Sequence, residues 1–157
     1  MKGQSLIEVI VALVVVSSIV IAVSSLAVST LGGTNFVKAQ TTASQYAQEG
    51  MEVVRQIKDA DYSLFLLYLI GAKTVYCMDN TNTLIISDGD SCTVPNINDI
   101  FIRQIIFEQD DDKCGVGSVK ITSDVSWTDS TCDNTNPYCH NVRLSSCFTN
   151  FTAVPTP

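Results

Sequence analysis

The sequence predicts an α+β fold, in which one long N-terminal helix packs on a small antiparallel β-sheet that carries disulfides. Three observations lead to this prediction. The chain contains an uncharged apolar run of twenty-three residues, from Val9 to Leu31. Helical periodicity follows this run, and beyond Gly71 the apolar spacing changes from about 3.6 to 2, which is the strand period. All six cysteines lie beyond the apolar run.

The length and charge of the chain limit its class. Its 157 residues suffice for one modest domain and a long apolar element. The formal net charge is -7, and the nine lysines and arginines are scattered along the chain. Nucleic-acid binding requires clustered basic residues, so no nucleic-acid partner is expected.

The apolar run is longer than the roughly 20 residues that a helix needs to cross a bilayer. Lys2 precedes the run and acidic sequence follows it, which predicts a cytoplasmic N-terminus and an extracytoplasmic head. A cleaved secretory signal is disfavoured because the run is too long and no A-x-A-like site follows it. A plain signal anchor does not explain Glu8, since a carboxylate in a spanning helix costs a few kcal/mol toward the bilayer centre.

The residues Gly3-Gln4-Ser5-Leu6-Ile7-Glu8 resemble the processing site of type IV prepilins, which is a short basic leader ending in Gly, then four residues, then Glu. The resemblance implies that a prepilin peptidase cuts between Gly3 and Gln4 and that Gln4 is then N-methylated. Many family members carry an aromatic residue where this chain has Gln4. The new α-ammonium would pair with Glu8 of a neighbouring subunit, where a low dielectric strengthens the attraction. The alternative is that Glu8 only snorkels to the membrane surface.

A second segment extends the resemblance. Ala47–Asp59 is similar to the outer half of the helix in minor pilins of the PilV type and in type II secretion pseudopilins. The resemblance implies a pilin-like lollipop whose parts are a leader peptide (1–3), a transmembrane and filament-core helix (4–31), an amphipathic outer helix half (32–60), a β head with disulfides (61–152) and a frayed tail (153–157).

The function that this resemblance implies is structural. The chain would be a minor, non-enzymatic subunit of a type IV pilus-like filament, without a cofactor. It would begin as a single-pass precursor in the cytoplasmic membrane and end in a cell-surface filament. Its partners would be prepilin peptidase, other pilin subunits and the pilus assembly platform. The alternatives are a type II secretion or competence pseudopilin, or an exported single-pass binding protein that never polymerises.

The helical part contains one ambiguity, at Gly32-Gly33. These glycines either end the helix or only soften it, because each costs about 1 kcal/mol relative to alanine. Beyond them, small and apolar residues recur at spacings of three and four, which predicts an amphipathic helix; they are Ala43, Tyr46, Ala47, Gly50, Val53, Val54 and Ile57. The short apolar run Leu64–Ile70 is expected to pack under the head.

Alternating or β-branched runs predict an antiparallel meander of three main strands, with smaller strands possible. The candidate strands are Thr74–Met78, Thr83–Ser87, Ile100–Glu108, 119–128 and 142–149. Trp127 lies on the apolar side of its strand and is expected in the core. Ile100–Glu108 has the composition of a strand that is buried on both faces.

An even number of cysteines beyond the apolar run indicates disulfides in a small exported domain. The six are Cys77, Cys92, Cys114, Cys132, Cys139 and Cys147. Fifteen pairings are possible. Proximity in the chain favours Cys77–Cys92 and Cys132–Cys139, which leaves Cys114–Cys147 to link two predicted strands. The chain has no C-x-x-C and a single histidine, so a zinc site is disfavoured.

No catalytic constellation stands out in the head. His140 is expected to be a surface residue. The acidic segments Asp110–Asp112 and Asp88-Gly89-Asp90 could bind calcium, or they could be solvated turns.

Overall fold

The structure is a computed structural model that describes residues 4–149. The predicted leader, with the cleavage-site residue Gly3, and the predicted tail 153–157 lie outside the described residues. The elements in chain order are α1 (Gln4–Ala60), α2 (Tyr62–Leu66), β1 (Lys73–Met78), β2 (Leu84–Ile86), β3 (Phe101–Gln109), α3 (Asp111–Cys114), β4 (Val119–Trp127) and β5 (His140–Phe148). An N-terminal helix followed by a small antiparallel sheet confirms the predicted α+β class.

Helix α1 continues through Gly32 and Gly33, so the glycine pair does not end it. The chain nevertheless divides into two compact units, Met1–Lys38 and Ala39–Pro157. In the second unit, α1 buries a stripe of residues at the predicted spacing; these residues are Ala43, Ala47, Gly50, Met51 and Val54. Met51 was not among the predicted positions.

The chain leaves α1 through a capped turn. Asp61 has an extended backbone, and its carboxylate accepts hydrogen bonds from the backbone N–H groups of Ser63 and Leu64, which starts α2. The expectation that Leu64–Ile70 packs under the head is confirmed for part of the segment: Phe65 lies in the core, and Tyr68 and Leu69 pack against it. Only Phe65 is fully buried, because a helix of five residues can turn few side chains inward. The exposed apolar side chains of this segment are Leu64, Leu66, Leu67 and Ile70.

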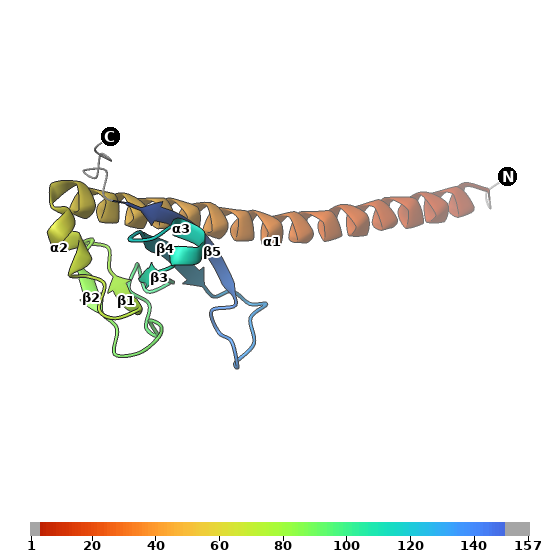
Figure 1. Cartoon of the computed structure of the whole chain (residues 1–157). Helices are drawn as coiled ribbons and strands as arrows, with labels where there is room; N and C mark the ends of the chain where they lie inside the picture. The colour runs from red at the N-terminus through yellow and green to blue at the C-terminus, as the bar shows by residue number, and fades with distance from the viewer. Residues whose placement is uncertain (1–3, 150–157) are drawn as a thin grey trace, which may run out of the picture. The chain divides into compact units, whose positions relative to one another are not determined.

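The sheet has five strands in the order β2-β1-β3-β4-β5, and every neighbouring pair is antiparallel (Figure 1). Each strand overlaps one of the five candidates. The prediction of three main strands is confirmed by β3, β4 and β5, which have nine residues each. Strand β1 has six residues, which is longer than expected of a minor strand. Strand β3 lies at the centre and is buried along most of its length on both faces.

The core lies between the sheet and the part of α1 that belongs to the second unit. One cluster is aromatic and surrounds Phe65, Phe107 and Phe148. The other contains Trp127, which is 2% exposed and so confirms the predicted core position. Ala43 and Ala47 pack in the same cluster, and their small side chains allow the helix to approach the sheet closely.

The helix approaches the sheet closely at Gly50. A Cβ atom there would lie 2.9 Å from Ile105 Cδ1 and 2.9 Å from Ser123 Oγ. Gly33, in the same helix, would have no atom within 4 Å of its Cβ. A side chain at position 50 would therefore have to displace the ends of the Ile105 and Ser123 side chains, whereas one at position 33 would meet no such neighbour.

We expect Gly50→Val to lower the free energy of unfolding by about 2–3 kcal/mol, because a branched side chain would force β3 and β4 away from α1. The matched variant Gly33→Val should change it by less than about 0.5 kcal/mol. Denaturant titration of the full chain in detergent micelles, followed by Trp127 fluorescence, measures both. Equal effects at the two positions would contradict the close approach.

Candidate functional site

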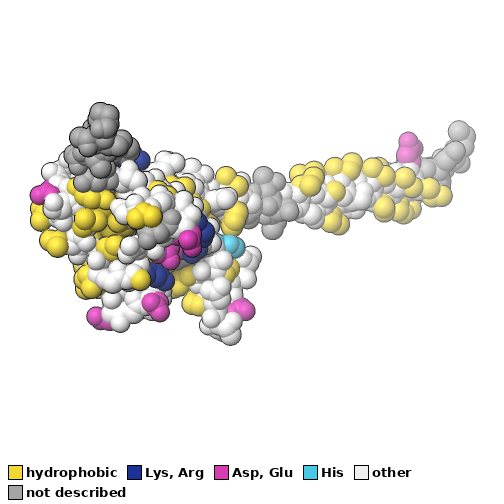
Figure 2. All heavy atoms as spheres, viewed as in Figure 1, with side chains coloured by type: hydrophobic (Ala, Val, Ile, Leu, Met, Phe, Trp, Pro, Cys, Tyr) yellow, Lys and Arg dark blue, Asp and Glu magenta, His cyan; other side chains and the backbone are white. Residues whose placement is uncertain are grey.

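The N-terminal part of α1 is an apolar segment without cover. Leu6–Leu26 has a mean hydropathy of 3.0 and none of it is buried. By length and composition, this segment could cross a membrane. Figure 2 shows hydrophobic side chains along the visible face of this part of the helix. An exposed apolar surface of this size is typical of a segment that contacts lipid or other protein.

Serine hydroxyls within the apolar segment are satisfied by the helix itself. Ser17 and Ser18 donate hydrogen bonds of 3.0 and 2.8 Å to the carbonyls of Val14 and Val15. Ser24 and Ser25 make the corresponding bonds one turn back, of 2.8 and 3.0 Å. These hydroxyls therefore cost little in an apolar environment, where an unpaired polar group is expensive.

Glu8 is the one charged residue within Leu6–Leu26. Its side chain is exposed, and it has no ion-pair partner among the described residues. Gln4 is the first residue of α1, and the structure describes its backbone but not its side chain. The structure thus places Glu8 one turn into a continuous helix and leaves its carboxylate open to contact another molecule.

Three disulfides restrain the head; two are the pairs that chain proximity favours, and the third is the pair that those two leave. Cys77–Cys92 ties β1 to the loop after β2, and Cys114–Cys147 ties α3 to β5. Cys132–Cys139 closes the loop between β4 and β5. Because side chains alternate along a strand, Cys77 and Cys147 lie on the sheet face opposite the buried Tyr76 and Phe148. Two disulfides therefore fasten segments over the face that α1 does not cover.

A buried arginine joins the helix to the sheet. The Arg103 side chain is fully buried in β3, and its Nη1 lies 3.1 Å from Glu49 Oε2 of α1. The same nitrogen donates to the Tyr46 carbonyl at 3.3 Å. Burial lowers the pKa of Arg103, and the nearby carboxylate of Glu49 opposes this shift. The guanidinium is therefore held charged by partners rather than by water.

The other side of the same guanidinium reaches the turn between β1 and β2. Arg103 donates to the carbonyls of Met78 and Asp79 and to Asn82 Oδ1, the last at 2.8 Å. Asn82 adopts a left-handed φ of 62° and returns a hydrogen bond of 3.1 Å to Glu49 Oε1. One side chain thus fixes the turn against the helix. In the sequence, the one sign of this site is a single arginine within the otherwise uncharged run 100–107.

Among the side chains that the structure describes, those of the two acidic segments do not converge into a group that could hold a metal ion. Asp110 lies 3.1 Å from the ammonium of Lys120 and 3.8 Å from that of Lys113. The hydrogen bond from Lys120 is the main reason that the pKa of Asp110 is lowered. Asp88 and Asp90 are exposed in the loop after β2. The interpretation as a solvated turn fits Asp88-Gly89-Asp90, whereas Asp110 is ion-paired and Asp112 lies in α3.

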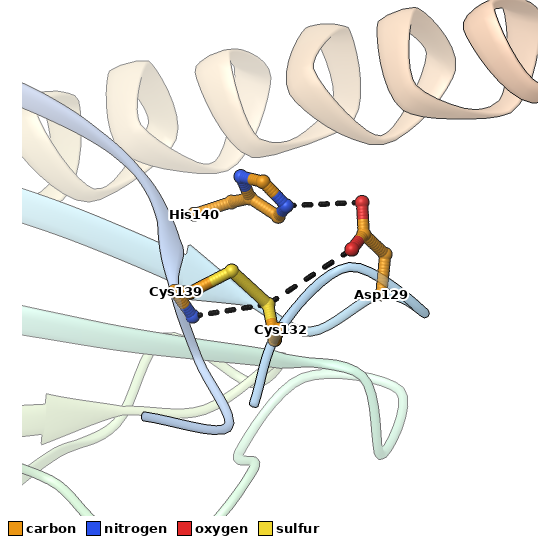
Figure 3. A group of neighbouring side chains, drawn as sticks. All are labelled: Asp129, Cys132, Cys139 and His140. Atoms are coloured by element: carbon orange, nitrogen blue, oxygen red, sulfur yellow. Dashed lines mark hydrogen bonds and ion pairs between the residues drawn. A yellow bond between two sulfur atoms is a disulfide. The ribbon is translucent and has the colours of Figure 1, made fainter. Parts of the chain in front are cut away.

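A group of ligating side chains converges at the β4–β5 loop, where the sequence predicted none. Figure 3 shows its members, Asp129, Cys132, Cys139 and His140. One potential ligand atom from each lies within 4.8 Å of the other three. This is the one cluster of three or more such side chains within the described residues. His140 is half-buried rather than fully exposed, and its ring stacks on Trp127 with the centroids 5.5 Å apart.

Hydrogen bonds hold this group in place. His140 Nε2 lies 3.0 Å from Asp129 Oδ2, and Asp129 Oδ1 accepts from the hydroxyl and the backbone N–H of Thr131. The Thr131 hydroxyl is the main reason that the pKa of Asp129 is lowered. The disulfide leaves neither cysteine as a thiolate, so in this state only Asp129 and His140 could ligate a metal.

No protein-family model, no curated protein and no solved structure matches the chain.

We expect Arg103→Met to lower the free energy of unfolding by about 3–5 kcal/mol, because it leaves three acceptors of the β1–β2 turn and Glu49 without their donor. The matched variant is Arg55→Met, since Arg55 forms an exposed pair with Glu52 at 2.7 Å. That variant should cost less than about 1 kcal/mol. Denaturation followed by Trp127 fluorescence compares the two, and similar losses would contradict the role given to the buried guanidinium.

Proposed function

We propose that the protein is a structural subunit, of the minor type, of a type IV pilus-like filament. Prepilin peptidase removes residues 1–3, and the chain assembles through the N-terminal part of α1. The observation that carries the proposal is an uncovered apolar helical segment with a single carboxylate near its start, at Glu8. The motif Gly3 to Glu8 supplies the position of the cut.

The apolar surface of Leu6–Leu26 is uncovered in the single chain. Lipid covers it in the precursor, and helices of other subunits replace that lipid in the filament. Helix association in an apolar medium depends on van der Waals packing and favours small residues. The segment provides such residues in Ala12, Ala22 and the serines whose hydroxyls already bond within the helix. Exchange of lipid for neighbouring helices therefore requires no change in α1.

Glu8 gives the assembly a register. It lies four positions after Gln4, which is about 6 Å along a helix axis. The α-ammonium created at Gln4 can therefore meet Glu8 of a subunit displaced by about one helical turn. In a low dielectric this attraction offsets the cost of desolvating both charges, and an unpaired carboxylate would be costly. A plain membrane anchor has no use for this carboxylate.

The head fits an extracytoplasmic location. Its three disulfides form and persist in oxidising compartments. Lys2 before the apolar run favours a cytoplasmic N-terminus, which places the head on the other side of the membrane.

Co-expression of the full chain with a prepilin peptidase tests the processing step. We expect mass spectrometry to find a mature N-terminus at Gln4, carrying one methyl group. Gly3→Leu should abolish the cut, whereas Lys2→Arg should leave it unchanged. An intact Met1, or a cut beyond Leu31, would exclude the pilin interpretation in favour of an anchored or secreted binding protein.

Replacement of Glu8 tests the assembly step separately. We expect Glu8→Ala to be inserted and cleaved normally, and to be incorporated into filaments at least about tenfold less, as measured by immunoblotting of sheared filaments. Glu52→Ala, which removes an exposed carboxylate from the outer part of α1, is the matched control. Normal incorporation of the Glu8 variant would rule out the pairing of Glu8 with a neighbouring N-terminus.

A further inference from the structure

The β4–β5 loop brings together the ligand types that zinc prefers. Two cysteine sulfurs, one imidazole nitrogen and one carboxylate oxygen lie within 4.8 Å of one another. Zinc is bound tetrahedrally by sulfur at about 2.3 Å and by nitrogen or oxygen at about 2.0–2.2 Å, so its ligand atoms lie roughly 3.5–3.8 Å apart. The four atoms therefore need only small movements to reach that arrangement, once the sulfurs are no longer bonded to each other.

The backbone already permits both states of the cysteines. The Cα atoms of Cys132 and Cys139 are 5.4 Å apart. Rotation about the side-chain bonds would move the two sulfurs from a covalent bond to about 3.8 Å without opening the loop. Cys139 follows the loop and His140 begins β5, so the rigid sheet positions the imidazole beside the sulfurs (Figure 3).

Outer hydrogen bonds orient two of the four ligands, Asp129 and Cys132. Asp129 Oδ1 is occupied by Thr131, at 2.7 Å from its backbone N–H and 2.6 Å from its hydroxyl, which leaves Oδ2 directed at His140. The backbone N–H of Cys139 donates to Cys132 Sγ at 3.3 Å, a contact that would stabilise a thiolate there. Partners of this kind orient metal ligands and contribute substantially to affinity.

We infer that Asp129, Cys132, Cys139 and His140 form a Zn²⁺ site in the dithiol state of the chain, and that metal binding and the Cys132–Cys139 disulfide are alternative states of the same two sulfurs. The ribosome makes the dithiol state. Binding of Zn²⁺ releases two protons, one from each thiol. A small-molecule disulfide then oxidises the pair by thiol–disulfide exchange: the Cys132–Cys139 bond forms, the oxidant leaves as two thiolates, and Zn²⁺ is released.

The ligand set favours zinc over calcium and magnesium. Two thiolates and an imidazole are soft or borderline donors, whereas calcium takes six to eight oxygen ligands. The group supplies one carboxylate. Once the disulfide is formed, only Asp129 and His140 remain, and two ligands hold zinc far more weakly than four. The site is thus expected to switch with the redox state of the pair.

Cobalt(II) tests the site because its absorption reports both tetrahedral geometry and thiolate ligands. The full chain is kept anaerobic in zwitterionic detergent micelles, either oxidised or reduced with a phosphine. We expect the reduced chain to show thiolate-to-cobalt and tetrahedral d–d bands that Zn²⁺ abolishes, and the oxidised chain to show neither. Equal binding by the oxidised chain would overturn the inference.

Variants separate this site from the other four thiols. Cys132→Ser/Cys139→Ser should abolish the bands, and the matched pair Cys77→Ser/Cys92→Ser should retain them. Asp129→Asn and His140→Gln should weaken cobalt binding more than about tenfold, as should Thr131→Val through its effect on Asp129. Asp133 lies in the same loop but accepts its hydrogen bonds from Thr135. The control variant Asp133→Asn should therefore bind cobalt as tightly as the unchanged chain does. Unchanged affinity in the Asp129 and His140 variants, or bands that persist without Cys132 and Cys139, would contradict the site.

A second measurement does not depend on spectra. Zn²⁺ should slow formation of the Cys132–Cys139 disulfide by oxidised glutathione more than about tenfold, as followed by alkylation and peptide mass spectrometry. Formation of Cys77–Cys92 should proceed at the same rate with and without the metal. If both pairs oxidise equally fast in the presence of Zn²⁺, the two sulfurs do not hold the metal.

Discussion

The guanidinium of Arg103 connects parts of the head that would otherwise have few polar contacts with one another. It receives no water, because the side chain is fully buried, and it is surrounded by Glu49 and Tyr46 of α1 and by the β1–β2 turn. A buried charge is expensive unless every donor has a partner. The positions of α1, the centre of β3 and the β1–β2 turn are therefore coupled through one residue.

The close packing of α1 on the sheet depends on the same arrangement. Gly50 follows Glu49 in sequence, so a close approach of helix to sheet lies one residue after the carboxylate that meets Arg103. On one side of this point lies the aromatic cluster around Phe65 and Phe107, and on the other lies the cluster around Trp127. The polar contact sets the register of the helix, and the apolar clusters supply most of the buried surface.

The two faces of the sheet are stabilised by different means. The face toward α1 is covered by packed side chains, whereas the opposite face carries loops fastened by Cys77–Cys92 and Cys114–Cys147. A small domain with one covered face has a limited core, and cross-links reduce the entropy of its unfolded chain. The third disulfide joins residues only seven positions apart, so it constrains the unfolded chain least. Asp129 and His140 lie beside the sulfurs of Cys132 and Cys139, which is the basis for the zinc site inferred for the dithiol state.

The sequence by itself determined the elements: a continuous apolar run, helical spacing up to Ile57 and five strand candidates, because periodicity is a local property that survives into the fold. The pairing of cysteines by proximity also follows from local geometry. Only the tertiary structure decided which polar residues meet. Arg103 finds Glu49 across 54 positions, and His140 meets Asp129 across a loop, contacts that no spacing rule contains. It also decided that Leu64–Ile70 stays mostly exposed, since burial depends on which surface is available to cover an apolar run and not on its composition.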